Sequence, residues 1–192
     1  MSEQDGAQVS SLQRPANEDK EGWRAYWRLQ GQPWRTEPEI DEKRQRYLAE
    51  RRGIQPDVEQ GIYPFRSVKL GRADVEWLLA THEGGRGPVD WSDESQRERE
   101  GLDLRGADLQ EVDLHLLPLA RLGGSLNQEE WGSATEEQRK IAGVVMNRAD
   151  LKGALLQGAN LRWAQLDGAR LVGAQFERAS LRRVQLERAN LY

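Results

Sequence analysis

Large apolar residues recur every five positions in the last quarter of the chain. An amphipathic helix repeats every 3.6 residues and a half-buried strand every 2, so neither element explains this spacing. Small residues, mostly alanine, stand two positions before the large ones, and the other positions are mainly polar. The large positions are Met146, Leu151, Leu156, Leu161, Leu166, Leu171, Phe176, Leu181, Leu186 and Leu191. The pattern therefore predicts a tandem repeat whose unit is five residues long.

A shorter block with the same spacing precedes it at residues 102–119. The pentads ADLQE, ADLKG and ANLRW resemble the motif of the pentapeptide repeat family, A(D/N)LXX. The resemblance implies a right-handed, four-sided β-solenoid in which each pentad forms one side and 20 residues form one coil. One coil cannot bury its own leucines, so neighbouring coils must stack to form a core.

The repeat predicts which side chains fill the bore and which residues stack. The expected core residues are Leu151, Leu156, Leu161, Leu166, Leu171, Phe176, Leu181 and Leu186. Glycines in the repeat suit corner turns, where they can adopt positive φ. Residues 20 apart should lie one above another. The expected pairs are Asp150 with Arg170, Asn160 with Ser180, Trp163 with Arg183 as a cation–π contact, and Arg162 with Arg182 as a like-charge pair.

The rest of the chain predicts an α+β protein, in which an α-rich segment caps the solenoid. Helices are expected over 37–52, with Thr36 as N-cap, and over 72–83. Thr135 and Gln138 have capping-box spacing and predict a short helix on the solenoid's flank. The expected organisation is a disordered arm at 1–20, a tryptophan-containing cap at 21–101, a first repeat block at 102–119, a helical excursion at 120–145 and the main solenoid at 146–192.

Composition removes most kinds of chemistry from consideration. The chain has no cysteine, and its two histidines, His82 and His115, show no metal-ligand spacing. The glycine-rich segment 83–88 lacks the Lys-Ser/Thr of a phosphate-binding loop. No apolar run is long enough to span a membrane, and the N-terminus lacks the apolar core of a signal peptide. We therefore expect no catalytic residues, no metal, no cofactor, no membrane association and a cytoplasmic location.

Charge and aromatic residues suggest where a partner would bind. The net charge is −4, yet residues 146–192 carry eight Lys and Arg against four Asp and Glu. The candidate interaction surface combines Arg162, Trp163, Arg182, Arg183 and Arg188 of the solenoid with Trp23, Trp27 and Trp34 of the cap. For the three cap tryptophans, an aromatic core that seals the solenoid end is the main interpretation. A platform for stacking a nucleobase or a peptide is the alternative.

These features predict a non-enzymatic scaffold or protein-interaction module with an unidentified macromolecular partner. Nucleic-acid binding through the basic residues is the alternative. Some pentapeptide repeat proteins imitate DNA and bind DNA gyrase, but they need a long, strongly acidic surface, so this function ranks last. The apolar last coil also suggests a homodimer formed through the C-terminal coil.

Overall fold

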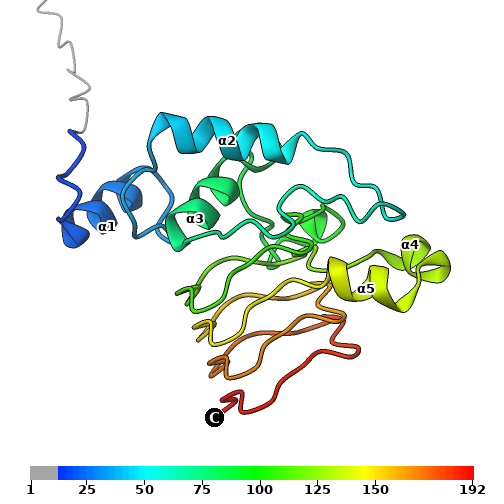
Figure 1. Ribbon diagram of the computed structural model, residues 1–192. Helices are drawn as coiled ribbons and strands as arrows, with labels where there is room; N and C mark the ends of the chain where they lie inside the picture. Colours follow the sequence, from blue (N-terminus) through cyan, green and yellow to red (C-terminus); the bar gives the residue numbers. More distant parts are fainter. Residues whose placement is uncertain (1–12) are drawn as a thin grey trace, which may run out of the picture.

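The computed structural model describes residues 13–192, which form a stack of coils with helices over one end and along one corner (Figure 1). Figure 1 shows α1 (Lys20–Leu29), α2 (Glu42–Arg52) and α3 (Arg72–Ala80) at the end where the stack begins, and α4 (Gln128–Ser133) and α5 (Glu136–Ala142) at its side. Two 3₁₀ turns, His82–Gly85 and Glu94–Gln96, lie between α3 and the repeats. Of the expected disordered arm, 1–12 lie outside the described residues, and Asp19 already caps α1.

Single parallel bridges join each coil to the next, and residues 13–192 contain no longer strands. In the main block the bridged residues are 20 apart, as in Val145–Gln165–Gln185, which agrees with a coil of four pentads. In the earlier coils each bridged residue lies between two buried neighbours and points outward, whereas in the last coil these neighbours are partly buried or exposed. The four faces are defined by these residues: face 1 by Asp103, Gly123, Asn160 and Ser180; face 2 by Lys69, Asp108, Val145, Gln165 and Gln185; face 3 by Asp113, Asp150, Arg170 and Asn190; face 4 by Pro118, Leu155 and Gln175.

The corners are β-turns in which the second residue after each apolar centre has positive φ. In the first turn of the main block, Ala149 N donates to Met146 O at 3.1 Å, and Arg148 has φ +58°. Large residues in this conformation lie over glycines of the next coil. A Cβ on Gly153 would meet Leu116 Cδ2 at 2.7 Å, and one on Gly168 would meet Arg148 Cγ at 3.3 Å. The corner glycines therefore provide both the backbone conformation and the room that a larger neighbour needs.

The bore is filled by the expected leucines down to the third coil. Leu151, Leu156, Leu161 and Leu166 are fully buried, and Leu171 is 3% exposed. Phe176 and Leu186 are only partly buried against this core. Leu181 differs from the expectation, because 38% of it is exposed. It lies in the last part of the described stack, where no further coil covers it.

The excursion is shorter than the expected 120–145, because 120–124 remain in the solenoid. Gly123 bridges to Asn160, and Gly124 N donates to Asn160 O at 2.9 Å. The chain returns at Val144, whose N–H bonds to Gly124 O at 2.9 Å. Between these points α5 begins at the expected capping box of Thr135 and Gln138. A second helix, α4, was not expected and is capped by Asn127 and Glu130 in the same way.

The cap extends the solenoid core rather than forming a separate one. Leu48 of α2 and Leu78 of α3 are fully buried in the same cluster as the repeat leucines. Residues 67–70 add one side above the first coil, because Lys69 bridges to Asp108. Val68 and Leu70 occupy the two inward positions of that side and are buried.

The predicted helix boundaries in the cap were partly wrong. Helix α2 begins at Glu42 with Asp41 as its N-cap, not at Thr36. Thr36 and Glu37 instead donate their backbone N–H groups to the buried carboxylate of Glu76, at 2.9 and 3.0 Å. Helix α3 ends at Ala80 rather than at residue 83. The C-terminal end of α2, with Arg51 and Arg52 before Gly53, is as expected.

A buried ionic network attaches the cap to the first coil. Arg72 of α3 donates to Glu76 at 2.8 Å and to Asp113 of face 3 at 3.2 Å. Burial raises the pKa of Glu76, although hydrogen bonds from Glu37 and the charge of Arg72 oppose the rise. For Asp113, burial acts to raise the pKa, but hydrogen bonds from His115 and the Arg72 charge outweigh it and lower the pKa. The helices are therefore fixed to the repeats by charge pairing as well as by apolar packing.

Candidate interaction surface

The corner between faces 1 and 2 collects basic and aromatic residues from three separate segments. Helices α4 and α5 leave the solenoid at this corner, and the turns of the second and third coils pass beside them. We call this surface the basic corner; it consists of Trp131, Arg139, Lys140, Arg162, Trp163, Arg182 and Arg183. Its basic residues number five, and two tryptophan rings lie among them.

Trp131 of α4 joins the insertion to the repeats. The guanidinium carbons of Arg139 and Arg162 lie 4.8 and 5.3 Å from the centre of its ring. Arg162 also donates to Ser180 Oγ at 2.9 Å and to Gln128 Oε1 at 3.1 Å. These contacts hold the guanidinium of Arg162 against α4, although no carboxylate of residues 13–192 pairs with it.

Trp163 occupies the turn of the second coil and is 9% exposed. Its backbone is in the left-handed region, with φ +59°, an uncommon conformation for a bulky residue. The guanidinium of Arg183 lies 5.1 Å from the ring centre, which confirms the expected cation–π contact, and Lys140 Nζ lies at 5.8 Å. The indole Nε1 is buried and has no hydrogen-bond partner among the described residues.

The other predicted stacking pairs have different outcomes. Arg170 Nη1 lies 2.9 Å from Asp150 Oδ2, as expected for an ion pair on face 3. Asn160 and Ser180 are bridged on face 1. Arg162 and Arg182 occupy equivalent places in successive coils, but Arg162 turns toward α4 while Arg182 remains exposed.

Arg188 does not join the basic corner, although the sequence grouped it there. It follows Leu186 at the next corner, between faces 2 and 3, in the same column as Arg148 and Gly168. A period of five places residues 183 and 188 on neighbouring corners of the coil. The two arginines therefore diverge around the solenoid.

The cap tryptophans belong to α1 and the segment that follows it, away from the basic corner (Figure 1). Trp23 and Trp27 of α1 are 2% and 5% exposed and stack on each other with ring centres 5.4 Å apart. The guanidinium of Arg35 lies 3.5 Å from the Trp27 ring centre. Trp34 is partly buried against the solenoid core. Their burial agrees with an aromatic core and contradicts the alternative of exposed rings for Trp23 and Trp27.

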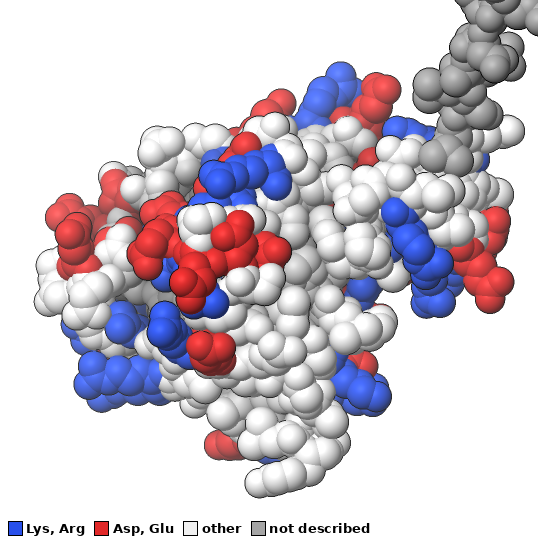
Figure 2. All heavy atoms as spheres, turned by 180° about the vertical axis from the view of Figure 1, so that it is seen from behind, with Lys and Arg blue, Asp and Glu red and all other residues white. Residues whose placement is uncertain are grey.

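Seen from behind, one part of the surface is predominantly basic (Figure 2). Lys and Arg gather low on the side of the insertion, and Asp and Glu lie above them. Within residues 13–192, no carboxylate lies within 4 Å of the side-chain nitrogens of Arg162, Arg182 or Arg183. Arg139 is also unpaired there and donates to Trp131 O at 2.8 Å. Lys140 pairs with Glu136 at 3.4 Å, so the positive charge that residues 13–192 leave unpaired at this corner is that of its arginines.

Three residues of this surface were missed by the sequence analysis: Trp131, Arg139 and Lys140. All three belong to the insertion, which has no repeat to fix its position. The usable signal was the capping box at Thr135, because a helix that begins there carries Arg139 and Lys140 in its last turn. Nothing in the local sequence indicates that Trp131 contacts Arg162.

Both histidines are hydrogen-bonded to neighbouring residues of the chain. His82 Nε2 lies 2.8 Å from Glu100 O, and His115 Nδ1 lies 2.8 Å from Asp113 Oδ1. Among residues 13–192, no cluster of three His, Asp or Glu side chains is arranged to hold a metal ion. In the same part of the chain, no helix has the length and apolar character needed to cross a membrane.

Comparison with known proteins identifies the repeats. A family model described as pentapeptide repeats, in eight copies, matches residues 145–183 and 159–192. No curated protein matches the chain. The first block at 102–119 lies outside the matched residues, but its bridges to the main block place it in the same solenoid.

Similar solved structures are pentapeptide repeat proteins from photosynthetic organisms. Rfr23 of the cyanobacterium Cyanothece 51142 is 24% identical, with 45% of this chain and 44% of that chain covered and a TM-score of 0.26. HetL of Nostoc sp. strain PCC 7120, involved in heterocyst differentiation regulation, is 30% identical over 45% and 35%, with a TM-score of 0.30. A protein of the Arabidopsis thaliana thylakoid lumen is 26% identical over 46% and 50%, with a TM-score of 0.19. The similarity thus spans half or less of each of these chains.

Proposed function

We propose that this chain, whose residues 145–192 match the pentapeptide repeat family, is a non-enzymatic protein-interaction module whose basic corner binds an acidic surface of a partner protein. The observation that carries the proposal is the unpaired charge of Arg162, Arg182 and Arg183 beside two tryptophans. Arginine is among the residue types most enriched at protein–protein hot spots, and the two tryptophan rings support Arg162 and Arg183.

The rigidity of the corner supports a binding role. Arg162 is held by Ser180, Gln128 and the Trp131 ring, so little side-chain entropy is lost when it meets a carboxylate. Arg182 and Arg183 are exposed on the adjoining turn of the next coil. The surface therefore combines one fixed guanidinium with two that can adjust to a partner.

A protein partner is favoured over nucleic acid because the aromatic rings of the basic corner are covered. Non-specific binding of single strands relies on exposed rings on which bases stack. Here two guanidinium groups lie over Trp131, and Trp163 is 9% exposed. Imitation of DNA is disfavoured because the corner is basic rather than acidic. The partner must be present in the same compartment as this chain, which we expect to be the cytoplasm.

The experiment is capture of partners from the native host, with and without nuclease, followed by rebinding of the purified partner. The test variant is Arg182→Glu with Arg183→Glu. Arg178→Glu with Arg188→Glu is a matched control, since it reverses two exposed arginines of the last turns that lie at other corners. We expect the test variant to weaken rebinding by at least tenfold, about 1.4 kcal/mol, and the control to bind normally. Equal binding by both variants, or loss of capture after nuclease treatment, would overturn the proposal.

A further inference from the structure

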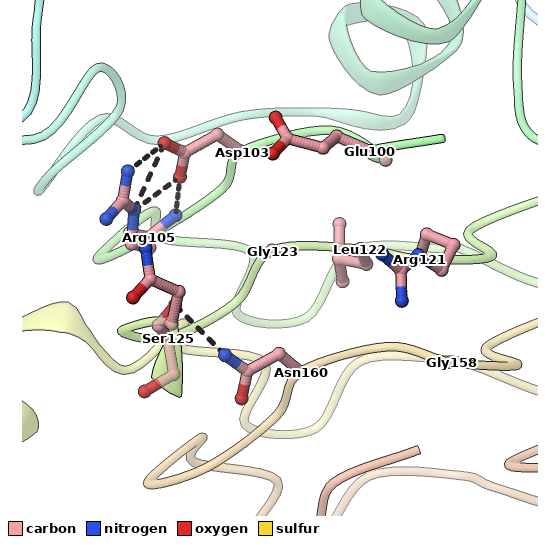
Figure 3. Close-up of a pocket in the computed structure, with 11 residues that line it drawn as sticks. Glu100, Asp103, Arg105, Arg121, Leu122, Gly123, Ser125, Gly158 and Asn160 are labelled. Carbon is pink, nitrogen blue, oxygen red and sulfur yellow. Dashed lines mark hydrogen bonds and ion pairs between the residues drawn. The ribbon is translucent and has the colours of Figure 1, made fainter. Parts of the chain in front are cut away.

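A hollow of about 210 Å³ lies on face 1, over the outward position of Gly123 (Figure 3). Figure 3 shows Glu100 and Asp103 above the backbone of Gly123, and Ser125 and Asn160 below it. Arg121 lies at the other end of the lining. The volume is smaller than the roughly 300–1,000 Å³ of sites for drug-sized ligands, so any ligand of this hollow is small.

Gly123 forms the hollow without being needed for the fold. The other residues at this position of face 1 are Asp103, Asn160 and Ser180, all with side chains. Gly123 does not have positive φ, and a Cβ there would meet its nearest atoms at 3.5 and 3.6 Å, which is ordinary contact. A glycine that neither backbone conformation nor packing requires is typical of places where a ligand approaches the backbone.

Several polar groups around the hollow have unused hydrogen-bonding capacity. Ser125 is 3% exposed, and its Oγ has no hydrogen-bond partner in residues 13–192. Arg121 donates from Nε to Arg99 O at 3.0 Å, and within the described chain its remaining nitrogens have no partner. The Glu100 carboxylate forms no ion pair there either.

Asp103, in contrast, is already neutralised. Arg105 donates to it at 2.6 Å and to Glu130 of α4 at 2.8 Å. The charges left free at the hollow are therefore one carboxylate, on Glu100, and one guanidinium, on Arg121. The lining residues as a whole carry balanced charge, because Asp103 and Arg105 cancel.

We propose that this hollow binds a free α-amino acid, with its cationic nitrogen toward Glu100 and its carboxylate toward Arg121. A metal ion is disfavoured because only one unpaired carboxylate is present, and an inorganic anion because Glu100 repels it. A sugar is disfavoured because no aromatic ring lines the hollow. The proposal does not depend on the function of the basic corner.

The first test is ligand-observed NMR of the full chain with the free amino acids at about 10 mM, a concentration that detects millimolar dissociation constants. We expect at least one to bind saturably. Its N-acetylated and C-amidated forms, and the Glu100→Gln variant, should bind about tenfold more weakly, since each removes one charged hydrogen bond. If no free amino acid binds, or if the blocked forms bind equally well, the proposal is wrong.

The second test fills the hollow without altering the fold. Gly123→Asn introduces the side chain that Asn160 carries at the same position of the next coil, and it should abolish binding. Gly173→Asn is the matched control, because Gly173 lies at an exposed corner with no atom closer than 4.0 Å, and asparagine tolerates its φ of +70°. Both variants should keep their melting temperatures. Unchanged affinity in a folded Gly123→Asn variant would overturn the proposal.

Discussion

Replacing Gly143 by alanine tests how closely the α4–α5 insertion is attached to the solenoid. Gly143 follows α5 with φ −63° and ψ 126°, a conformation that alanine adopts freely. A Cβ there would clash with Trp163 O and would lie 3.0 Å from Trp163 C and 3.2 Å from Lys140 O. All three atoms belong to the backbone, so no side chain can move aside.

The expected loss of stability follows from the backbone shift that these contacts require. Ordinary contact begins near 3.4 Å, so the end of α5 must move by about 1 Å from the Trp163 turn. Val144 follows directly and donates to Gly124 O at 2.9 Å, so the shift also disturbs the return of the chain to the solenoid. Overpacking of this kind costs about 1–3 kcal/mol, and we expect the upper half of that range.

Thermal denaturation is the assay, with Gly132→Ala as the control. A loss of about 2–3 kcal/mol corresponds to a melting temperature lower by about 4–12 °C for a chain of this size. Gly132 lies inside α4 with nothing within 4 Å of a Cβ, so alanine there should be neutral or stabilising by up to about 1 kcal/mol. Amide exchange over α5 should accelerate only in Gly143→Ala. If that variant matches the control in both measurements, the inferred close packing is incorrect.

Three further predictions concern the cap and the corners. Arg72→Ala should destabilise by about 3–5 kcal/mol in urea denaturation, because it leaves Glu76 charged and buried; a loss below 1 kcal/mol would contradict this. Since the pKa of Glu76 is raised in the folded chain, its contribution to stability is present below about pH 4.5 and lost as pH rises through the folded pKa; urea titrations of Glu76→Gln should lack this component. Gly153→Ala should cost about 1–2 kcal/mol, because φ is +64°, and adding Leu116→Ala should relieve only the steric part, as a double-mutant cycle of melting temperatures would reveal.

The solenoid could be predicted in detail because its pattern is strictly local. Each pentad repeats the same inward and outward positions, so the register follows from counting, and the pairs Asp150–Arg170 and Trp163–Arg183 follow from a 20-residue coil. The repeat cannot be recognised where the residue types depart from the motif, even though the backbone keeps the conformation of the coil. Leu122 occupies an alanine position and Gly124 a leucine position, so this pentad was assigned to the excursion.

The candidate surface could be predicted only where the repeat itself supplies it. Arg162, Arg182 and Arg183 follow from the register, but Trp131 reaches them through the docking of an insertion that no period describes. The predicted start of α2 was wrong for a related reason. Thr36 has the residue type and spacing of an N-cap, but its backbone N–H bonds to Glu76, 40 residues away. The sequence around Thr36 does not indicate a partner at that distance.

The insertion has a consequence for how such a chain can change. Asn160 bridges to Gly123, 37 residues earlier, whereas Ser180 bridges to Asn160 at the usual 20, so the detour adds 17 residues without shifting the ladder. Its two ends, Gly124 and Val144, are hydrogen-bonded to each other. This corner therefore allows an insertion of different length and charge to replace the present one without changing the register of the coils on either side of it.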